Sequence, residues 1–420
     1  EKIWRTVIVM EKKIEHYDVV VIGGGPGGMT AALYAGRARL KTLLIEKSLI
    51  GGMATYTSEI ENYPGFPEPI DGIELMKLFD KQFRRFGVDG KLTDVQSVSV
   101  ECNTKIVSTF RTDYHAKAVI IATGNKPRLT GAKNEERFLN DKGISFCATC
   151  DAARNTGKRI MVIGSGDAAI EEGMFLTKFA REVLVSVIHN EGIMDANKVA
   201  QEKALANPKM KFIWNTVVES FEGDDMLKQV VLKNIKTGEL MPYDVDTCFL
   251  FIGYVPNTKI FEGLVEMTNR GYIKTNENME TSREGFYAVG DCRDKTLRQV
   301  ATAVGDGAIA GFMVEKYVEE LEYLQKEIFE ANGLIMAFIY NAVEAVDREY
   351  LARIEQIQKL YSEKVQLRRI DIYKSDRIAC KLSYTKTPSL IFMKNGNILE
   401  NITDLSNLDA KVAEAVKQYS

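Results

Sequence analysis

The chain has 420 residues, which at about 150 residues per domain predicts two or three domains. Hydrophobic residues make up 45% and charged residues 27%, values that exclude long disordered, collagen-like and coiled-coil chains. Fifty-five basic side chains against 58 acidic ones give a net charge of −3, which argues against nucleic-acid binding driven by bulk charge.

Further features of the sequence bear on its cellular compartment. No stretch approaches the ~18 consecutive apolar residues of a membrane-spanning helix. Six cysteines are too few for a disulfide-stapled secreted scaffold, and the apolar run Val7–Met10 is too short for a signal peptide. Because Met10 lies just inside the sequence, we expect residues 1–9 to be an upstream extension or a cloning remnant. We therefore expect a cytoplasmic protein with no membrane and no nucleic-acid partner.

The first chemical motif is a glycine loop near the N-terminus. A predicted strand at 18–22 runs into Gly23, Gly25 and Gly28, a helix follows, and the next predicted strand ends on Glu46. Glycines in this spacing let the backbone turn tightly and approach a pyrophosphate at the helix N-terminus, and an acid at the strand end can bind an adenosine ribose. The combination predicts a dinucleotide site; the alternative, a purely structural turn, does not account for the acid.

The same pattern returns about 140 residues later. A predicted strand at 159–163 precedes Gly164, Gly166 and Ala169, followed by a helix and a second strand at 183–188. Strands alternate with helices through most of the chain, so we expect an α/β protein with two Rossmann-like dinucleotide-binding domains on mostly parallel sheets.

The residues after the second unit's last strand are unusual for a nicotinamide site. His189, Asn190 and Glu191 stand where an NADPH site usually carries Arg or Lys, and Asp195 lies just beyond. These side chains should repel a 2′-phosphate, whereas Glu191 or His189 could bind a ribose hydroxyl. Three interpretations remain open: an NADH site, a vestigial fold without nicotinamide function, and NADPH bound by residues that the sequence does not reveal.

Two cysteines three positions apart form the sharpest chemical feature. Cys147 and Cys150 lie near a predicted helix start, where a lowered thiolate pKa favours disulfide exchange, and Asp151 adjoins them as a candidate proton shuttle. Zinc binding would need two further ligands at matching spacing. Only three histidines exist, and no second pair is formed by the remaining cysteines Cys102, Cys248, Cys292 and Cys380. We therefore expect a redox pair and no metal, with inert core cysteines as the alternative.

Several motifs occur in a fixed order around these units. They are Gly23–Gly28, Glu46, Gly51-Gly52, Glu61–Gly65, Ala122-Thr123-Gly124, Cys147–Asp151, Phe251–Thr258, Gly290-Asp291 and Arg298-Gln299. In this order they resemble the bacterial low-molecular-weight thioredoxin reductases over about residues 17–325.

The resemblance implies a homodimeric flavoprotein whose FAD-binding domain is interrupted by a smaller nucleotide domain. The expected boundaries are 1–127 and 257–326 for the two parts of the FAD-binding domain, and 128–256 for the pyridine-nucleotide-like domain with the cysteine pair. The expected FAD-binding residues are Gly23, Gly25, Gly28, Glu46, Gly52, Asn62, Ala122, Thr123, Gly124, Gly290, Asp291, Arg298 and Gln299. Gly164, Gly166 and Ala169 would bind a nicotinamide nucleotide if one binds at all.

By resemblance, individual residues also acquire roles. Asp291 contacts the ribityl or pyrophosphate part of FAD, Asn62 lies near the isoalloxazine, and Asp151 acts as the acid at the disulfide. Cys147 is the exposed attacking thiol and Cys150 faces the flavin.

Two departures from the family pattern affect the choice of electron donor. The basic stretch that grips the NADPH phosphate is missing at 189–195, which is closer to the flavoprotein subunit of alkyl hydroperoxide reductase, a relative that uses NADH. Other relatives take electrons from ferredoxin. Met53 stands where the family commonly has Gln. We therefore expect NADH or a donor such as ferredoxin, and regard NADPH as doubtful.

The block at 333–420 has its own strand and helix order, joined through a linker expected near 327–332. Thr387-Pro388 before a predicted strand and a turn at 394–397 make it similar to thioredoxin, and Pro388 is a candidate cis proline. Residues 341–347, where thioredoxin has its redox pair, contain no cysteine. The block could aid packing, dock a partner, or use Cys380 as a lone exchange thiol, although apolar neighbours predict that Cys380 is buried.

Together these features predict an FAD-dependent disulfide reductase that acts on thioredoxin or a similar small disulfide protein. The alternatives are a flavin-dependent dithiol oxidase that uses oxygen and a non-catalytic redox sensor or scaffold built on the same core.

Overall fold

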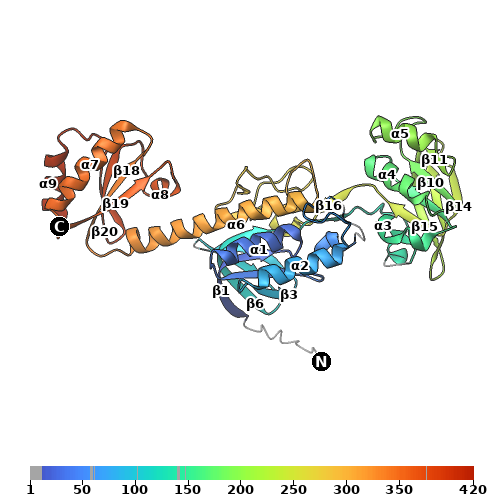
Figure 1. Ribbon diagram of the computed structural model, residues 1–420, viewed down its shortest axis with the longest axis horizontal. Helices are drawn as coiled ribbons and strands as arrows, with labels where there is room; N and C mark the ends of the chain where they lie inside the picture. The colour runs from blue at the N-terminus through green and yellow to red at the C-terminus, as the bar shows by residue number, and fades with distance from the viewer. Residues whose placement is uncertain are drawn as a thin grey trace, which may run out of the picture. The chain divides into compact units, whose positions relative to one another are not determined.

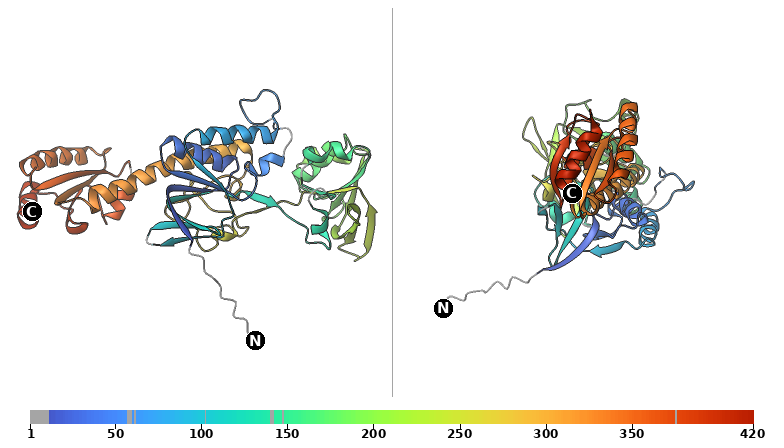
Figure 2. Two further views of the ribbon diagram at one scale, coloured as in Figure 1. Left: turned by 90° about the horizontal axis from the view of Figure 1, so that it is seen from below. Right: turned by 90° about the vertical axis from the view of Figure 1, so that its left-hand side faces the viewer.

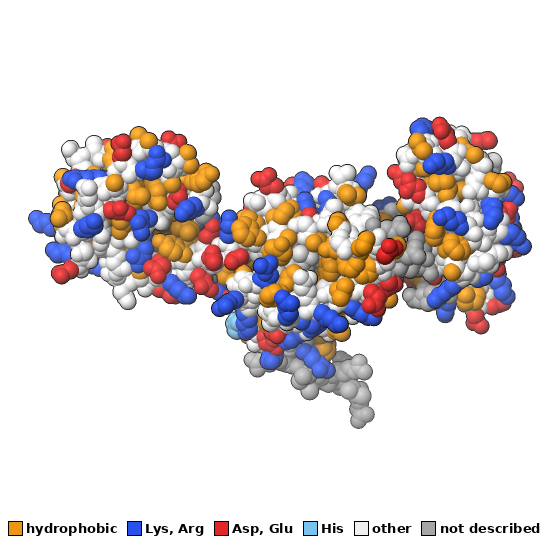
Figure 3. Space-filling model, in the orientation of Figure 1, with side chains coloured by type: hydrophobic (Ala, Val, Ile, Leu, Met, Phe, Trp, Pro, Cys, Tyr) orange, Lys and Arg blue, Asp and Glu red, His pale blue; other side chains and the backbone are white. Residues whose placement is uncertain are grey.

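The computed structural model describes residues 12–56, 60, 62–101, 103–139, 142–146, 148–374 and 376–420, without the side chains of residues 56, 149, 150 and 376. The chain divides after Val314 into two compact units. In this described part, no helix combines the length and the apolar character that a membrane span requires. Acidic and basic side chains are interspersed over the face drawn in Figure 3, consistent with the near-neutral net charge.

The first unit contains a seven-stranded sheet. Six strands follow the order β3-β2-β1-β6-β5-β4, and the seventh, β17, pairs with the carboxyl end of β6. Its strands are β1 (Lys13–Ile22), β2 (Thr42–Glu46), β3 (Asp89–Leu92), β4 (Ser97–Glu101), β5 (Thr104–Ser108), β6 (Thr112–Ile121) and β17 (Phe286–Ala288). β1, β2, β3, β6 and β17 run parallel, whereas β4 and β5 form an antiparallel extension. The last four residues of β1 are buried, as expected for a central strand covered on both faces.

Helices α1 (Pro26–Arg37) and α2 (Gly72–Arg84) cover the same face of this sheet (Figure 1 and Figure 2). α2 begins at an Asp71 N-cap, whose carboxylate accepts from the backbone N–H groups of Ile73 and Glu74. The N-terminal part of α6 (Val300–Tyr323) packs against α1 so closely that a Cβ on Gly307 would lie 2.3 Å from the carbonyl oxygen of Gly27.

A second parallel sheet forms the inserted part of the first unit, in the order β11-β10-β9-β15-β8. Its strands are β8 (Ile144–Ser145), β9 (Arg159–Ile163), β10 (Glu182–Val187), β11 (Met210–Trp214) and β15 (Thr247–Leu250). The other elements of this part are α3 (Ala148–Asp151), α4 (Asp167–Leu176), α5 (Lys198–Leu205) and an antiparallel sheet of β12 (Thr216–Gly223), β13 (Leu227–Asn234) and β14 (Leu240–Asp244). The antiparallel pair β7 (Asn125–Pro127) and β16 (Tyr254–Pro256) carries the chain into and out of it.

The second unit is built on a four-stranded sheet in the order β19-β18-β20-β21. Its elements are β18 (Leu334–Tyr340), α7 (Ala345–Leu360), β19 (Val365–Asp371), α8 (Asp376–Lys381), β20 (Ser389–Lys394), β21 (Asn397–Ile402) and α9 (Leu408–Tyr419). β18 and β19 are parallel, and β20 runs antiparallel to both β18 and β21. The peptide bond between Thr387 and Pro388 is cis, which confirms the prediction for Pro388.

Two local expectations differ from the structure. The expected linker at 327–332 overlaps a π-helical segment, Leu324–Phe329, and Ile328 is fully buried in the second unit's core.

The prediction that Cys380 is buried is wrong, because this side chain is exposed. The buried residues Ala379 in α8 and Leu382 just after it lie three positions apart, and Cys380 is rotated about 100° from Ala379 on the helix. Apolar neighbours in the sequence therefore do not predict burial on a short helix.

The close packing of α6 on α1 generates a test with an internal control. Gly307→Ala should destabilise the first unit by about 1–3 kcal/mol, because its Cβ would lie inside van der Waals contact with α1. Gly305→Ala on the same helix meets no atom within 4 Å and should instead gain up to ~1 kcal/mol from helix propensity. Urea unfolding of both variants measures the difference; equal effects would contradict the contact.

Candidate functional site

The expected FAD-binding loops meet at the carboxyl end of the parallel strands in the first sheet. The backbone N–H of Ala122, just after β6, donates to the carbonyl of Ile22 at 2.8 Å, and Val289, just after β17, donates to Ile121 at 2.9 Å. Gly23 donates to the carbonyl of Ile45 in β2 at 2.8 Å. This edge is where open α/β sheets bind their ligands.

The glycine loop cannot accommodate a side chain at two of its three motif glycines, Gly23 and Gly28. Gly23 has φ +113°, and a Cβ there would lie 2.2 Å from the carbonyl oxygen of Ala122. A Cβ on Gly28 would lie 1.9 Å from the carbonyl oxygen of Gly23. Around Gly25 the space is open: it precedes α1 as an N-cap without a side-chain cap, so N–H groups of the first turn are available to an anion.

Glu46 and the paired glycines Gly51 and Gly52 lie against the first glycine loop. Glu46 Oε2 accepts from the N–H of Gly24 at 2.7 Å, which places a carboxylate beside the middle of the glycine loop. The N–H of Gly51 donates to the carbonyl of Gly24 at 2.8 Å, and a Cβ on Gly52 would lie 3.6 Å from the Cα of Gly25. The glycine loop, Glu46 and the Gly51-Gly52 pair thus lie together at one site.

The structure also brings together Asn62 and Gln299, which lie 237 positions apart. Asn62 Nδ2 donates to Gln299 Oε1 at 3.1 Å, and both side chains are exposed. Asn257 donates through its side chain to the carbonyl of Thr123 at 3.1 Å and through its N–H to the carbonyl of Gly124 at 3.0 Å. These contacts bring expected FAD-binding residues next to segments that are distant in the sequence.

The Gly290-Asp291 turn is held by a carboxylate that the sequence analysis missed. Asp306, nearly buried, accepts from the N–H of Gly290 at 2.9 Å and forms ion pairs of 2.7 Å with Arg293 and Lys295. Burial raises the pKa of the neighbouring Asp291. A signal for Asp306 existed, because it occupies the apolar face of α6 formed by small buried residues such as Ala303 and Ala310.

Arg298 supplies a partly buried cation at the same edge. Its guanidinium carbon lies 4.1 Å from the centroid of the Tyr272 ring, and its Nη2 donates to the carbonyl of Arg293 at 3.4 Å. Its Nε is buried and has no hydrogen-bond partner within the described ranges. An open helix N-terminus, a carboxylate beside the loop and an unsatisfied guanidinium nitrogen fit the anionic dinucleotide FAD.

The structure describes the cysteine pair only in part. Cys147 lies outside the described residues, and Cys150 is placed by its backbone in α3, without its side chain. Asp151, at the end of the same helix, is described fully: its Oδ2 accepts from Ser145 Oγ at 2.6 Å, and its Oδ1 lies 3.8 Å from Arg154 Nη1. A carboxylate is therefore fixed one residue from Cys150.

The two buried thiols of the described chain are poor candidates for redox chemistry. Cys248 and Cys292 are fully buried, and burial raises the pKa of both, that of Cys292 to about 11. A thiol with such a pKa is protonated near neutral pH and does not attack disulfides. Cys102 lies outside the described residues.

The second glycine loop repeats the geometry of the first. Gly164 has φ +135°, and a Cβ there would lie 2.4 Å from the carbonyl oxygen of Phe251. Gly166 has open space around it and precedes α4 as an N-cap without a side-chain cap, while Ala169 is fully buried against the loop. An N-terminus suited to a pyrophosphate is therefore present here too.

Carboxylates surround this second loop. Asp195 Oδ2 lies 2.9 Å from both Ser165 Oγ and His189 Nε2, and these two contacts lower the pKa of Asp195. Asp167 Oδ1 accepts from the N–H of Asn197 at 2.6 Å and from its side chain at 2.9 Å. Glu191, four positions before Asp195 in the sequence, is exposed.

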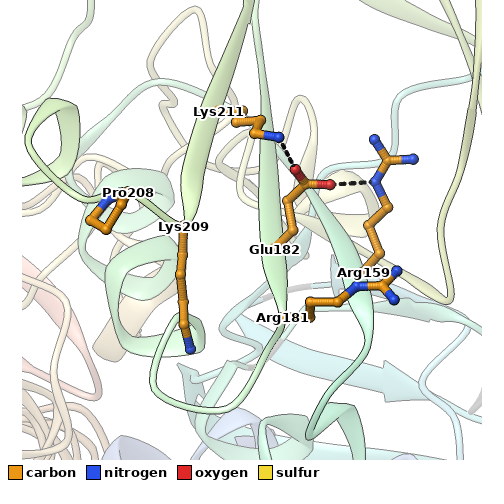
Figure 4. Close-up of a pocket in the computed structure, with 6 residues that line it drawn as sticks. All are labelled: Arg159, Arg181, Glu182, Pro208, Lys209 and Lys211. Carbon is orange, nitrogen blue, oxygen red and sulfur yellow. Dashed lines mark hydrogen bonds and ion pairs between the residues drawn. The ribbon is translucent and has the colours of Figure 1, made fainter.

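A basic cavity of about 470 Å³ lies at the opposite, amino end of the second parallel sheet (Figure 4). It is lined by Arg159, Arg181, Glu182, Pro208, Lys209 and Lys211. Figure 4 shows Glu182 between its ion-pair partners Arg159 and Lys211, and these partners lower its pKa. Lys209 donates to two backbone carbonyls that follow α4. Most charged side chains that line this cavity already form ion pairs or hydrogen bonds within the protein, so this cavity is not the candidate site.

Comparisons with known proteins give a consistent match. Residues 17–307 match the family described as pyridine nucleotide-disulphide oxidoreductase. A thioredoxin reductase of Peptoclostridium litorale is 44% identical over 311 residues, 73% of this chain and 98% of the relative. That of Bacillus subtilis is 42% identical over 319 residues, 76% of this chain and 99% of the relative. The crystal structure of Lactococcus lactis thioredoxin reductase has 39% identity and a TM-score of 0.64, covering 72% of this chain and 99% of that one.

The Asp306 cluster generates a stability test. Asp306→Asn should lower the free energy of unfolding by about 3–5 kcal/mol, because Arg293 and Lys295 would keep largely buried charges without an anion. Glu266→Gln, which removes the exposed ion pair with Lys274, is the control and should cost less than ~1 kcal/mol. Urea unfolding measures both; equal losses would show that the buried cluster has no special weight.

Proposed function

This chain belongs to the pyridine nucleotide-disulphide oxidoreductase family as a thioredoxin reductase-like, FAD-dependent oxidoreductase, and on that premise we propose that it reduces a protein disulfide such as that of thioredoxin through Cys147 and Cys150. The observation that carries the proposal is the fixed carboxylate of Asp151 at the end of the short helix that contains Cys150.

FAD, when bound at the first glycine loop, supplies the two-electron chemistry. The chain's own residues would bind and orient it: the first turn of α1 would face the pyrophosphate, and Glu46, which lies beside the Gly24 N–H, would accept from the adenosine ribose. Asp291, positioned by the Gly290 turn, and the Asn62–Gln299 pair lie at the same edge and are assigned to the flavin-side part of FAD.

The cysteine pair transfers its electrons by thiol–disulfide exchange. The Cys147 thiolate attacks one sulfur of the partner's disulfide and forms a mixed disulfide, and the partner's released thiolate takes up a proton. Cys150 then attacks the Cys147 sulfur, closes the Cys147–Cys150 disulfide and releases the partner as a dithiol. Asp151 moves the proton at each opening and closing of the pair. Two electrons and two protons thus pass from the enzyme dithiol to the partner.

We propose NADH, or a non-nicotinamide donor such as ferredoxin, as the source of electrons rather than NADPH. The carboxylates at the second glycine loop support this choice, since Asp195 and Glu191 would repel a 2′-phosphate. The described residues 189–195 present no Lys or Arg that would neutralise it.

The second unit is assigned a thioredoxin-like fold without redox function. Its strand order, the cis Thr387–Pro388 bond and the helix that follows β18 support this assignment. The segment 341–347 contains no thiol; instead the Asp347 carboxylate accepts from the N–H of Asn341 at 2.7 Å. We assign the unit to packing or docking in a homodimeric reductase, because it cannot carry electrons by disulfide exchange.

The role of the pair predicts a clean loss of function. Cys150→Ser should retain FAD and fold normally but abolish reduction of thioredoxin disulfide, because the enzyme disulfide cannot form. Cys380→Ser removes an exposed thiol outside the pair and should keep full activity. Absorbance at the flavin band and an insulin-coupled thioredoxin assay provide the measurements. Turnover retained by Cys150→Ser would refute the assignment.

The donor assignment predicts an order of flavin reduction rates. In anaerobic stopped-flow with NADH, NADPH and reduced ferredoxin at equal low concentration, NADPH should bleach the flavin more slowly than NADH. If NADPH is the faster nicotinamide, the interpretation of residues 189–195 is wrong. Reoxidation of the reduced enzyme by oxygen faster than by thioredoxin disulfide would favour a dithiol oxidase instead.

A further inference from the structure

The two glycine loops of this chain each hold a carboxylate against the same position of the loop. In the first loop, Gly24 lies between Gly23 and Gly25, and its N–H donates to Glu46 Oε2 at 2.7 Å. Glu46 is the last residue of β2, the place from which a carboxylate binds an adenosine ribose in dinucleotide folds.

In the second loop, Ser165 occupies the position of Gly24, between Gly164 and Gly166. Its Oγ donates to Asp195 Oδ2 at 2.9 Å, and its carbonyl accepts from the N–H of Asp195 at 3.0 Å. Asp195 does not end a strand: β10 ends at Val187, eight positions earlier. The carboxylate beside the second loop therefore comes from a segment after β10, and not from the strand end where such an acid is usually found.

Several contacts fix Asp195 while leaving it accessible. His189 Nε2 lies 2.9 Å from the same carboxylate oxygen, and the neighbouring Met194 and Ala196 are buried, which anchors the backbone on both sides. The side chain of Asp195 is 63% exposed, so a ligand can reach its other oxygen. The pKa of Asp195 is lowered by its contacts with His189 and Ser165, so that it is charged at neutral pH.

We propose that Asp195 is the specificity-determining residue of the second loop: it accepts hydrogen bonds from an unphosphorylated adenosine ribose and excludes a 2′-phosphate. This inference rests on the proposed function and deepens it, because it assigns the discrimination to one carboxylate positioned by Ser165. The neighbouring Asp167 does not take this place, because its carboxylate is hydrogen-bonded to Asn197.

The test uses full-length flavoprotein and two non-redox probes, AMP and adenosine 2′,5′-bisphosphate, with affinities measured by isothermal titration calorimetry. The wild type should bind AMP at least about tenfold more tightly, because a phosphate beside a carboxylate is repelled. Asp195→Asn should bring the two affinities within about threefold, and Asp195→Arg should favour the bisphosphate. Asp225→Asn, an exposed acid elsewhere in the inserted part, should keep the wild-type ratio.

Three results would overturn the inference: an unchanged ratio in Asp195→Asn, a wild-type preference for the bisphosphate, or no binding of either probe to the wild type. Ser165→Ala adds a second readout, since loss of the positioning hydroxyl should weaken AMP binding without favouring the bisphosphate. Failure of the proposed function is detected separately, because dithionite-reduced enzyme should reduce thioredoxin disulfide whatever nucleotide binds. Reduction without nucleotide discrimination would reject the role of Asp195 alone.

Discussion

The close contact between the first glycine loop and the end of β6 is the constraint on which the FAD-binding edge depends. A Cβ on Gly23 would lie 2.2 Å from the carbonyl oxygen of Ala122, so the chain passes there only as glycine. At this contact β1 and β6 end side by side at their carboxyl ends. The hydrogen bond from the Val289 N–H to the Ile121 carbonyl brings the end of β17 to the same edge. The helix N-terminus, Glu46 and the Gly290 turn take their places from this alignment.

The two glycine loops have the same backbone geometry but differ in the side chains beside them. Gly164 approaches the carbonyl of Phe251 as Gly23 approaches that of Ala122, and both helices begin without a side-chain cap. What differs is the source of the nearby carboxylate, a strand end in the first loop and a later segment in the second. Both loops thus present an open helix N-terminus, and they differ in the segment that supplies the carboxylate beside it.

The second unit forms a packed sheet with no thiol in residues 341–347. Carboxylates of Asp347 and Asp371 accept from N–H groups of that segment, and the Thr387–Pro388 bond is cis. Packing of β18 and β20 against the helices stabilises this sheet. The family match ends at residue 307, so this unit is an addition to the shared reductase core.

Local sequence patterns predict the elements whose formation depends on a few neighbouring residues. The predicted strand at 159–163 matches β9 to the residue, β2 ends on Glu46 as predicted, and both glycine loops fall between strand and helix as expected. The pairs of distant residues that meet are known from the folded chain and not from these patterns: Asn62 with Gln299, Asp306 with Gly290, and Asp195 with Ser165. Turn and strand preferences act over a few residues, whereas these contacts depend on strand register and helix packing across the whole sheet.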